Sequence, residues 1–269
     1  MAQNVASSCP DFLSETPVAA PSARPIVVGS YNVHKCVGVD RRFDPLRIAA
    51  VIAELDADVV ALQEVDRRFG RRSGLLDAET LRREGGLHLV HVSDLPDGHG
   101  WHGNALLVRE GLVTRLRRLA LPGAEPRGAI VTELALPAGR LRVVAAHFGL
   151  LRRCRMRQAA AILEEIAAGE AMPTLLVGDL NEWRPGRRSS LQPLGALFGP
   201  LEASPPSFPA PLPLMSLDRI FGWPQGVLRQ VAVHRSALSR VASDHLPLRA
   251  VVDLAAALPS DSAGLSQAA

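Results

Sequence analysis

Short apolar runs that each end in a polar residue are the feature of this 269-residue chain that most restricts its fold. The runs are rich in Val, Ile, Leu and Ala and are short, which is typical of buried β-strands. One of them, LLVGDLN, passes from a Leu-Leu-Val-Gly stretch directly to Asp179 and Asn181. A core strand that ends in a carboxylate and an amide places chemically active groups at one edge of the core.

Nine such segments are predicted as strands, and two longer segments are predicted as helices. The strands are expected at residues 25–33, 57–65, 87–92, 104–109, 129–136, 140–148, 174–181, 216–221 and 246–254. The first helix is expected over residues 44–56, with Asp44 as N-cap and Pro45 at the first helical position. The second is expected over residues 156–169, with Met156, Ala159 and Ile166 among the residues of its buried face.

The mixture of neighbouring strands and helix-linked strands favours an α/β (α+β) fold in which two packed sheets are flanked by helices. Periodicity alone does not exclude a doubly wound sheet. Residues 25–254 are predicted to form one continuous domain. Residues 1–24 and 255–269 are rich in Ala, Ser and Pro without periodicity, so both are predicted to be disordered tails.

Composition excludes several classes of protein. No apolar run approaches the roughly 20 residues of a membrane span, so we expect no stable membrane insertion. The N-terminus lacks the pattern of a signal peptide, and three widely spaced cysteines argue against a disulfide framework, so we expect a cytoplasmic protein. The net charge of +3 permits an anionic partner such as nucleic acid or lipid without requiring one. Lys35 is the only lysine among 30 basic residues.

Polar residues that bind metals or transfer protons stand at the ends of five predicted strands and just before another. They are Asn32, Glu64, His147, Asp179 with Asn181, Asp218, and the Asp244-His245 pair. Any one of them could simply hydrogen bond to the loop that follows its strand. Side chains at the ends of adjacent strands converge in space, however, and rigid strands are good platforms for sites. Together they therefore predict a functional site.

The residue types indicate metal-assisted hydrolysis of a phosphate ester. Asn32 and Glu64 offer hard oxygen ligands, which suit Mg²⁺ or Mn²⁺ better than zinc. Asp179 could orient or deprotonate a water, and the imidazoles of His147 and His245 could bind the phosphate or protonate the leaving group. Asp218 could fix the tautomer of one imidazole. The sequence contains no glycine-rich phosphate loop, serine nucleophile elbow or dinucleotide fingerprint.

Seven short motifs occur in the order that is typical of one superfamily. They are YN at 31–32, LQE at 62–64, GNALL at 103–107, AHF at 146–148, GDLN at 178–181, LDRIF at 217–221 and SDH at 243–245. Over residues 26–253 the chain therefore resembles the endonuclease/exonuclease/phosphatase superfamily, whose fold is that of deoxyribonuclease I. It is most similar to a compact bacterial branch of metal-dependent hydrolases.

The resemblance implies a four-layer α/β/β/α sandwich with the site at one edge of two packed sheets. It assigns Asn32 and Glu64 to the metal, with Asp244 nearby, and Asp179 with Asn181 to the attacking water. His147 and His245 are then expected near the phosphate, with Asp218 behind His245. Asn104 and Arg127 are expected to contact the substrate. For Arg127, a surface arginine in a turn is an equally good interpretation.

The predicted activity is hydrolysis of phosphodiester bonds by a monomeric enzyme, with DNA or RNA as the first candidate substrate. Arginines 67, 68, 71, 72, 82 and 83 could follow a phosphate backbone. Trp101 and Trp183 could stack on a base or a lipid head group, or could be partly buried core. The alternatives are a phospholipid or sphingolipid phosphodiesterase, a sugar or inositol phosphate phosphatase, and a catalytically silent binding module.

Overall fold

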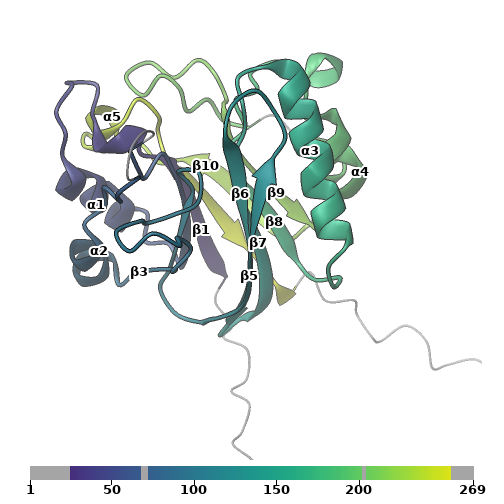
Figure 1. Ribbon diagram of the computed structural model, residues 1–269, viewed down its shortest axis with the longest axis horizontal. Helices are drawn as coiled ribbons and strands as arrows, with labels where there is room; N and C mark the ends of the chain where they lie inside the picture. The colour runs from purple at the N-terminus through teal and green to yellow at the C-terminus, as the bar shows by residue number, and fades with distance from the viewer. Residues whose placement is uncertain (1–24, 68–71, 202–203, 256–269) are drawn as a thin grey trace, which may run out of the picture.

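The computed structural model describes residues 25–67, 72–201 and 204–255 (Figure 1). The predicted disorder of residues 1–24 and of the segment from residue 256 onward falls outside the described residues. Arg68 and Arg71 fall outside them as well. None of the helices in the described part of the chain is both long and apolar enough to span a bilayer.

Two sheets form the centre of the molecule. The first has the strand order β10-β11-β1-β2-β4-β3 and the second has the order β5-β6-β7-β8-β9. The first sheet consists of β1 (Ile26–Asn32), β2 (Val59–Gln63), β3 (His88–Leu89), β4 (Ala105–Val108), β10 (Leu228–Val233) and β11 (Leu248–Val252). The second consists of β5 (Leu112–Leu121), β6 (Arg127–Leu136), β7 (Gly139–His147), β8 (Thr174–Asp179) and β9 (Asp218–Trp223).

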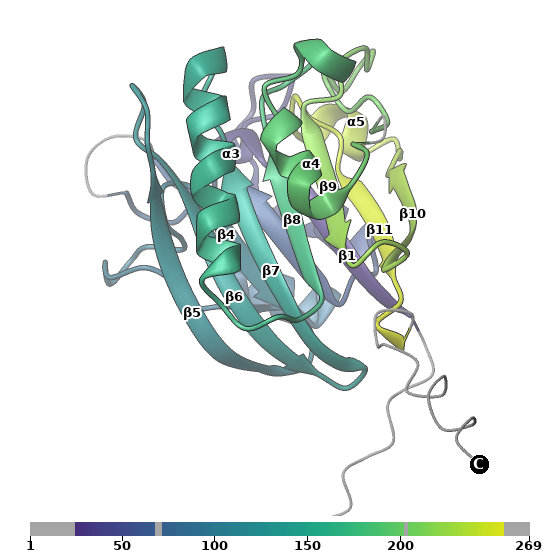
Figure 2. The ribbon, with the colours of Figure 1, turned by 90° about the vertical axis from the view of Figure 1, so that its right-hand side faces the viewer.

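Helices cover the outer faces of both sheets. Figure 1 shows α1 (Pro45–Glu54), α2 (Ala78–Gly85) and α5 (Ser239–Ala242) on the side of the first sheet. Figure 2 shows α3 (Arg152–Ala167) and α4 (Gly195–Phe198) over the second sheet. Short 3-10 turns occur at His34–Cys36, Gly186–Arg188 and Gln192–Leu194. The predicted four-layer sandwich is therefore confirmed.

The core follows the two-residue alternation of the strands. In β8, Leu175 and Val177 belong to the apolar cluster between the sheets, whereas Leu176 belongs to the cluster under α3 and α4. A third cluster lies between the first sheet and α1 and includes Ile48 and Ile52. Each sheet is thus buried on both faces, which explains why its central strands read as nearly continuous apolar runs.

Strands β5 and β10 and helices α2, α4 and α5 were not predicted from the sequence. Strand β5 alternates leucines with exposed arginines at the edge of its sheet, β10 is an edge strand with mostly partly exposed residues, and α2 buries little more than Leu81. Edge strands and short surface helices bury little apolar area, so their hydrophobic pattern is weak. The predicted strand at residues 87–92 is reduced to His88–Leu89.

Helix α3 begins at Arg152, four residues before the predicted start, and its buried face differs from the prediction. Ala159 and Ile166 are buried as expected, but Met156 is 39% exposed and Ile162 takes an inward position instead. The first helix, in contrast, is confirmed with its cap, because the Asp44 Oδ1 accepts the N–H of Arg47 at 2.9 Å.

We expect Asp44→Ala to lower the free energy of unfolding by about 1 kcal/mol, because the N–H groups in the first turn of α1 lose their acceptor. Urea denaturation of the two proteins measures the difference. Asp44→Ser retains an acceptor and serves as the matched control. Equal stability of wild type and Asp44→Ala would show that the cap does not stabilise the helix.

Candidate active site

Strand register places three of the predicted residues in one row across the second sheet. His147 pairs with Asp179 in the parallel β7–β8 ladder, and Asp179 pairs with Asp218 in the antiparallel β8–β9 ladder. All three continue the alternation that points Ala145 and Val177 into the core between the sheets. Their side chains therefore lie on the inner face of the sheet, at the end where the apolar core gives way to polar residues. Each of the three residues is at most 2% exposed.

The first sheet contributes Asn32 and Glu64 from the ends of two adjacent parallel strands. Asn32 pairs with Gln63 in the β1–β2 ladder, and Glu64 follows directly after β2 with a positive φ of 60°. The amide Nδ2 of Asn32 donates to Oδ2 of Asp179 at 3.0 Å. This hydrogen bond crosses the gap between the sheets and joins the two halves of the site.

Asp179 is the centre of the arrangement. Its Oδ1 accepts the main-chain N–H of Asn181 at 3.0 Å, which fixes the carboxylate at the start of the loop. Its Oδ2 lies 3.5 Å from His147 Nε2 and 3.8 Å from His245 Nε2, in addition to the Asn32 contact. One buried carboxylate thus faces two imidazoles and an amide.

His245 is held as a cation. Its Nδ1 lies 2.9 Å from Asp218 Oδ2, which also accepts the hydroxyl of Ser207, and the Phe208 ring packs against the imidazole at 4.8 Å between centroids. Burial opposes the charged form of His245, but the Asp218 carboxylate, aided by Asp179, raises its pKa to about 10.

His147 has the opposite protonation state. Complete burial lowers its pKa to about 4, and the neighbouring guanidinium of Arg127 acts in the same direction against the attraction of Asp179. The Nη1 of Arg127 lies 3.0 and 2.9 Å from the two ring nitrogens, and Glu125 holds the other side of the guanidinium. At neutral pH the site therefore contains one charged and one neutral imidazole, which suits them to different roles.

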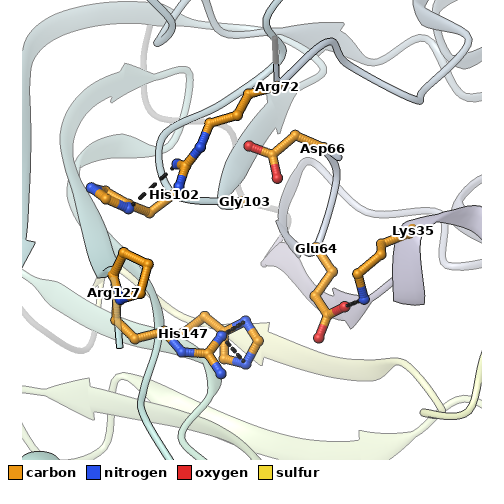
Figure 3. Close-up of a pocket in the computed structure, with 9 residues that line it drawn as sticks. Lys35, Glu64, Asp66, Arg72, His102, Gly103, Arg127 and His147 are labelled. Atoms are coloured by element: carbon orange, nitrogen blue, oxygen red, sulfur yellow. Dashed lines mark hydrogen bonds and ion pairs between the residues drawn. The ribbon is translucent and has the colours of Figure 1, made fainter. Parts of the chain in front are cut away.

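A small, open hollow lies beside His147 (Figure 3). Its lining includes Lys35, Glu64, Asp66, Arg72, His102, Arg127 and His147. Figure 3 shows the Lys35 ammonium against the Glu64 carboxylate, where the two form an ion pair. Burial disfavours the carboxylate of Glu64, but His147 and Lys35 overcome this and bring its pKa to about 2.

The sequence did not assign Lys35, Asp66 or His102 to the site. Lys35 occupies the left-handed region (φ 57°) between His34 and Cys36, which also have positive φ, so a strained turn positions its ammonium. The signal available in the sequence was a single lysine three residues after Asn32. Asp66 lies two residues after the LQE motif and His102 directly precedes the GNALL motif, but neither occupies a strand end.

The remaining predicted residues take separate positions around this centre. Asn181 adopts a positive φ of 53°, and its Nδ2 donates to Phe148 O at 2.9 Å. Asp244 Oδ1 lies 3.7 Å from His34 Nδ1, beside the end of β1. Asn104 is fully buried and donates to the carbonyls of Trp101 and Gly128, so it fixes that loop. Its contact with substrate stays a prediction.

Two groups of residues could hold a metal ion. Ligand atoms of Asp179, Asp218 and His245 lie within 4.8 Å of one another. The His245 cation already pairs with Asp218 there and lies 3.8 Å from Asp179, so it compensates part of the negative charge that a metal would need. Asn32 and Glu64 instead offer hard oxygens at adjacent strand ends, and the Glu64 side chain is 24% exposed at the hollow. The donor set at Asn32 and Glu64 therefore fits Mg²⁺ or Mn²⁺ better.

Residues 29–245 match the model of the Endonuclease/Exonuclease/phosphatase family. This match spans most of the chain and contains every predicted site residue, so the protein belongs to that family. The family acts hydrolytically on phosphate esters. A search of the curated proteins gave no match.

Solved structures of family members share the fold. An endonuclease/exonuclease/phosphatase from Beutenbergia cavernae is 24% identical, with a TM-score of 0.64 over 86% of this chain and 72% of that one. A mannosyl-6-phosphatase from Bacteroides thetaiotaomicron is 18% identical, with a TM-score of 0.63 over 84% and 99%. TDP2 from D. rerio, complexed with single strand DNA product, is 18% identical, with a TM-score of 0.61 over 84% and 98%.

The His245–Asp218 pair gives stability a specific pH dependence. Because the folded-state pKa of His245 (about 10) exceeds its ordinary 6.5, the pair contributes fully below pH 6.5 and its contribution is lost as the pH rises through 10. We expect Asp218→Asn to cost on the order of 3 kcal/mol below pH 6.5, and less near pH 10. Urea denaturation of both proteins in EDTA measures this. A cost that grows with pH would contradict the assignment.

Proposed function

We propose that this protein is a divalent-metal-dependent phosphoesterase that cleaves phosphodiester bonds by attack of a water that Asp179 positions. The observation that carries the proposal is the geometry at Asp179, where one buried carboxylate faces the cationic His245 and the neutral His147. Such a group of fixed charges can activate a nucleophile and stabilise the charge that develops on phosphorus-bound oxygens.

Asp179 would accept the proton of the attacking water at a carboxylate oxygen. The hydrogen bonds from Asn32 Nδ2 and the Asn181 N–H prevent its rotation, so its free lone pairs keep one direction. Asn181, at the start of the same loop, would contact the phosphate or the water. Its side chain is itself fixed by the carbonyl of Phe148.

The two imidazoles and Arg127 would divide the remaining tasks. His245 would donate its Nε2 proton in a charge-assisted hydrogen bond to the phosphate, while Asp218 holds Nδ1 and keeps the ring protonated. His147, as a neutral ring, would face the phosphate without repelling the divalent cation proposed at Asn32 and Glu64. Arg127 lies at the hollow beside His147, where its guanidinium could bind a phosphate oxygen.

Asn32 and Glu64 would hold the divalent cation, with Asp244 near the end of β1. Bound there, Mg²⁺ or Mn²⁺ would polarise the phosphoryl oxygens and neutralise developing charge. Lys35 already forms an ion pair with Glu64, so this carboxylate at the hollow binds a cationic group.

The choice of a phosphodiester over a monoester is a finer proposal. Similarity to the D. rerio TDP2 complex supports a nucleic-acid diester, which is also the substrate class that the sequence predicts. Similarity to the mannosyl-6-phosphatase supports a sugar phosphate. Hydrolysis of bis-p-nitrophenyl phosphate compared with p-nitrophenyl phosphate separates the two chemistries, and we expect faster cleavage of the diester.

Asp179→Asn should lower kcat for bis-p-nitrophenyl phosphate by at least about 10²-fold, because the amide cannot accept the water proton. The substitution preserves the size of a side chain that is 2% exposed, so circular dichroism should show an unchanged fold. Wild-type kcat in this variant would remove Asp179 from its proposed role. Arg140→Gln, at an exposed position near the start of β7, is a control for handling and purity.

Glu64→Ala should weaken Mn²⁺ binding, whereas Lys35→Met should strengthen it about fivefold, because the cation no longer competes with the ammonium for the carboxylate. Isothermal titration of the protein without substrate measures both dissociation constants. Lys35→Arg preserves the charge and is the matched control. An unchanged affinity in Glu64→Ala would place the metal elsewhere.

A further inference from the structure

Exposed apolar side chains gather at the end of the molecule that carries the site. Seven of the eleven large exposed hydrophobic residues in the described part of the chain lie in the loops that follow β1, β7 and β8 or precede β9. These seven are Val39, Phe43, Leu150, Leu151, Trp183, Leu212 and Leu214. Strand register brings the ends of β7 and β8 and the start of β9 to the same edge, the upper edge in Figure 1.

Two of these loops, the first taken together with the start of α3 at Arg152, also carry a concentration of arginines. Residues 149–153 read GLLRR and residues 182–191 read EWRPGRRSSL. Together they contain five arginines at 152, 153, 184, 187 and 188, and four of these are exposed. The only acidic residue of the two loops, Glu182, is fully buried. The surface that they present is therefore both apolar and positively charged.

A buried arginine holds these two loops together. Arg155 donates to Glu182 Oε2 at 3.2 Å, to Ser190 Oγ at 2.8 Å and to the carbonyl of Leu150. Arg155 is itself only 2% exposed, so this network fixes the backbone of Leu150, Leu151 and Trp183. These apolar side chains are therefore exposed on a rigid part of the surface.

The third loop, residues 204–217, contains no charged residue at all. Leu212 is 66% exposed and Leu214 is 73% exposed at its tip. Its base belongs to the site, because Ser207 bonds Asp218 and Phe208 packs on His245. Two exposed leucines therefore project from the loop that supports the cationic imidazole.

This combination suits a membrane surface better than a nucleic acid. Arginines and a tryptophan, here with Arg184 stacked on Trp183 at 4.6 Å, would serve either partner. Four exposed leucines, two of them on a charge-free loop, offer nothing to a phosphate backbone. Leucine and tryptophan side chains flanked by arginines are, in contrast, what inserts at the boundary between lipid head groups and acyl chains.

We propose that Leu150, Leu151, Trp183, Leu212 and Leu214, with Arg152 and Arg153, form a docking rim for the surface of an anionic phospholipid bilayer. The rim would hold the site over the head groups, so the substrate class is a phosphate ester of a membrane phospholipid. This inference rests on the proposed phosphoesterase function for the substrate, but the docking itself is independent of turnover.

Vesicle flotation in EDTA tests docking without catalysis. The wild type should float with vesicles of phosphatidylcholine mixed with phosphatidylglycerol, and only weakly with phosphatidylcholine alone. The Leu212→Ser/Leu214→Ser and Arg152→Gln/Arg153→Gln variants should each lose about tenfold in partition coefficient. The matched controls are Leu112→Ser, an equally exposed leucine at the opposite end of the sandwich, and Arg115→Gln/Arg117→Gln, two exposed arginines of β5.

Trp183 provides a second readout, because its fluorescence should shift to the blue on vesicle binding and the shift should disappear in Trp183→Phe. Binding of single-stranded oligonucleotides but not of vesicles would overturn the proposal in favour of nucleic acid. Equal vesicle binding by rim and control variants, or no binding at all, would also overturn it. If the wild type docks but cleaves no phosphate ester, the proposed function fails while the rim stands.

Discussion

The register of three strands is the constraint on which the site depends. Because His147, Asp179 and Asp218 are paired across β7, β8 and β9, their side chains share the inner face with Ala145 and Val177. A slip of one residue in β8 would turn Leu175 and Val177 from the core between the sheets toward α3 and α4, and would move Asp179 out of the site at the same time. Hydrophobic burial therefore fixes the positions of the polar groups on the second sheet. The hydrogen bond from Asn32 to Asp179 joins them to the residues that the first sheet contributes.

Given those positions, burial and neighbouring charges set the protonation states. His147 and His245 both lie within 4 Å of Asp179, yet their pKa values are about 4 and about 10. The difference arises because Arg127 stands beside His147 whereas Asp218 stands beside His245. The same fold that positions two identical side chains thus leaves His245 cationic and His147 neutral, and the proposed mechanism uses this difference to let His245 donate a charge-assisted hydrogen bond to the phosphate.

The positions of several candidate site residues were predictable from the sequence, because the apolar pattern shows which residue ends each core strand. The structure places Asn32, His147 and Asp179 at strand ends as predicted, whereas their roles in a reaction stay predictions. Contacts made across the two sheets, such as the Asn32–Asp179 bond, have no local signal, and neither does the strained turn that brings Lys35 to Glu64. The sequence also left the burial of Trp183 open, and its 54% exposure follows from the Arg155 network, which only the folded chain assembles.

The central claim is that this geometry performs metal-dependent hydrolysis of a phosphodiester. The most direct test incubates the purified protein, with Mg²⁺ or Mn²⁺ and with EDTA, against plasmid, oligonucleotides, phospholipid vesicles and inositol phosphates, with His245→Ala run alongside to detect contaminating enzymes. The account predicts cleavage of a diester that requires the metal and is lost in His245→Ala. Cleavage that persists in EDTA or in His245→Ala would contradict it, and so would the absence of cleavage of every substrate tested.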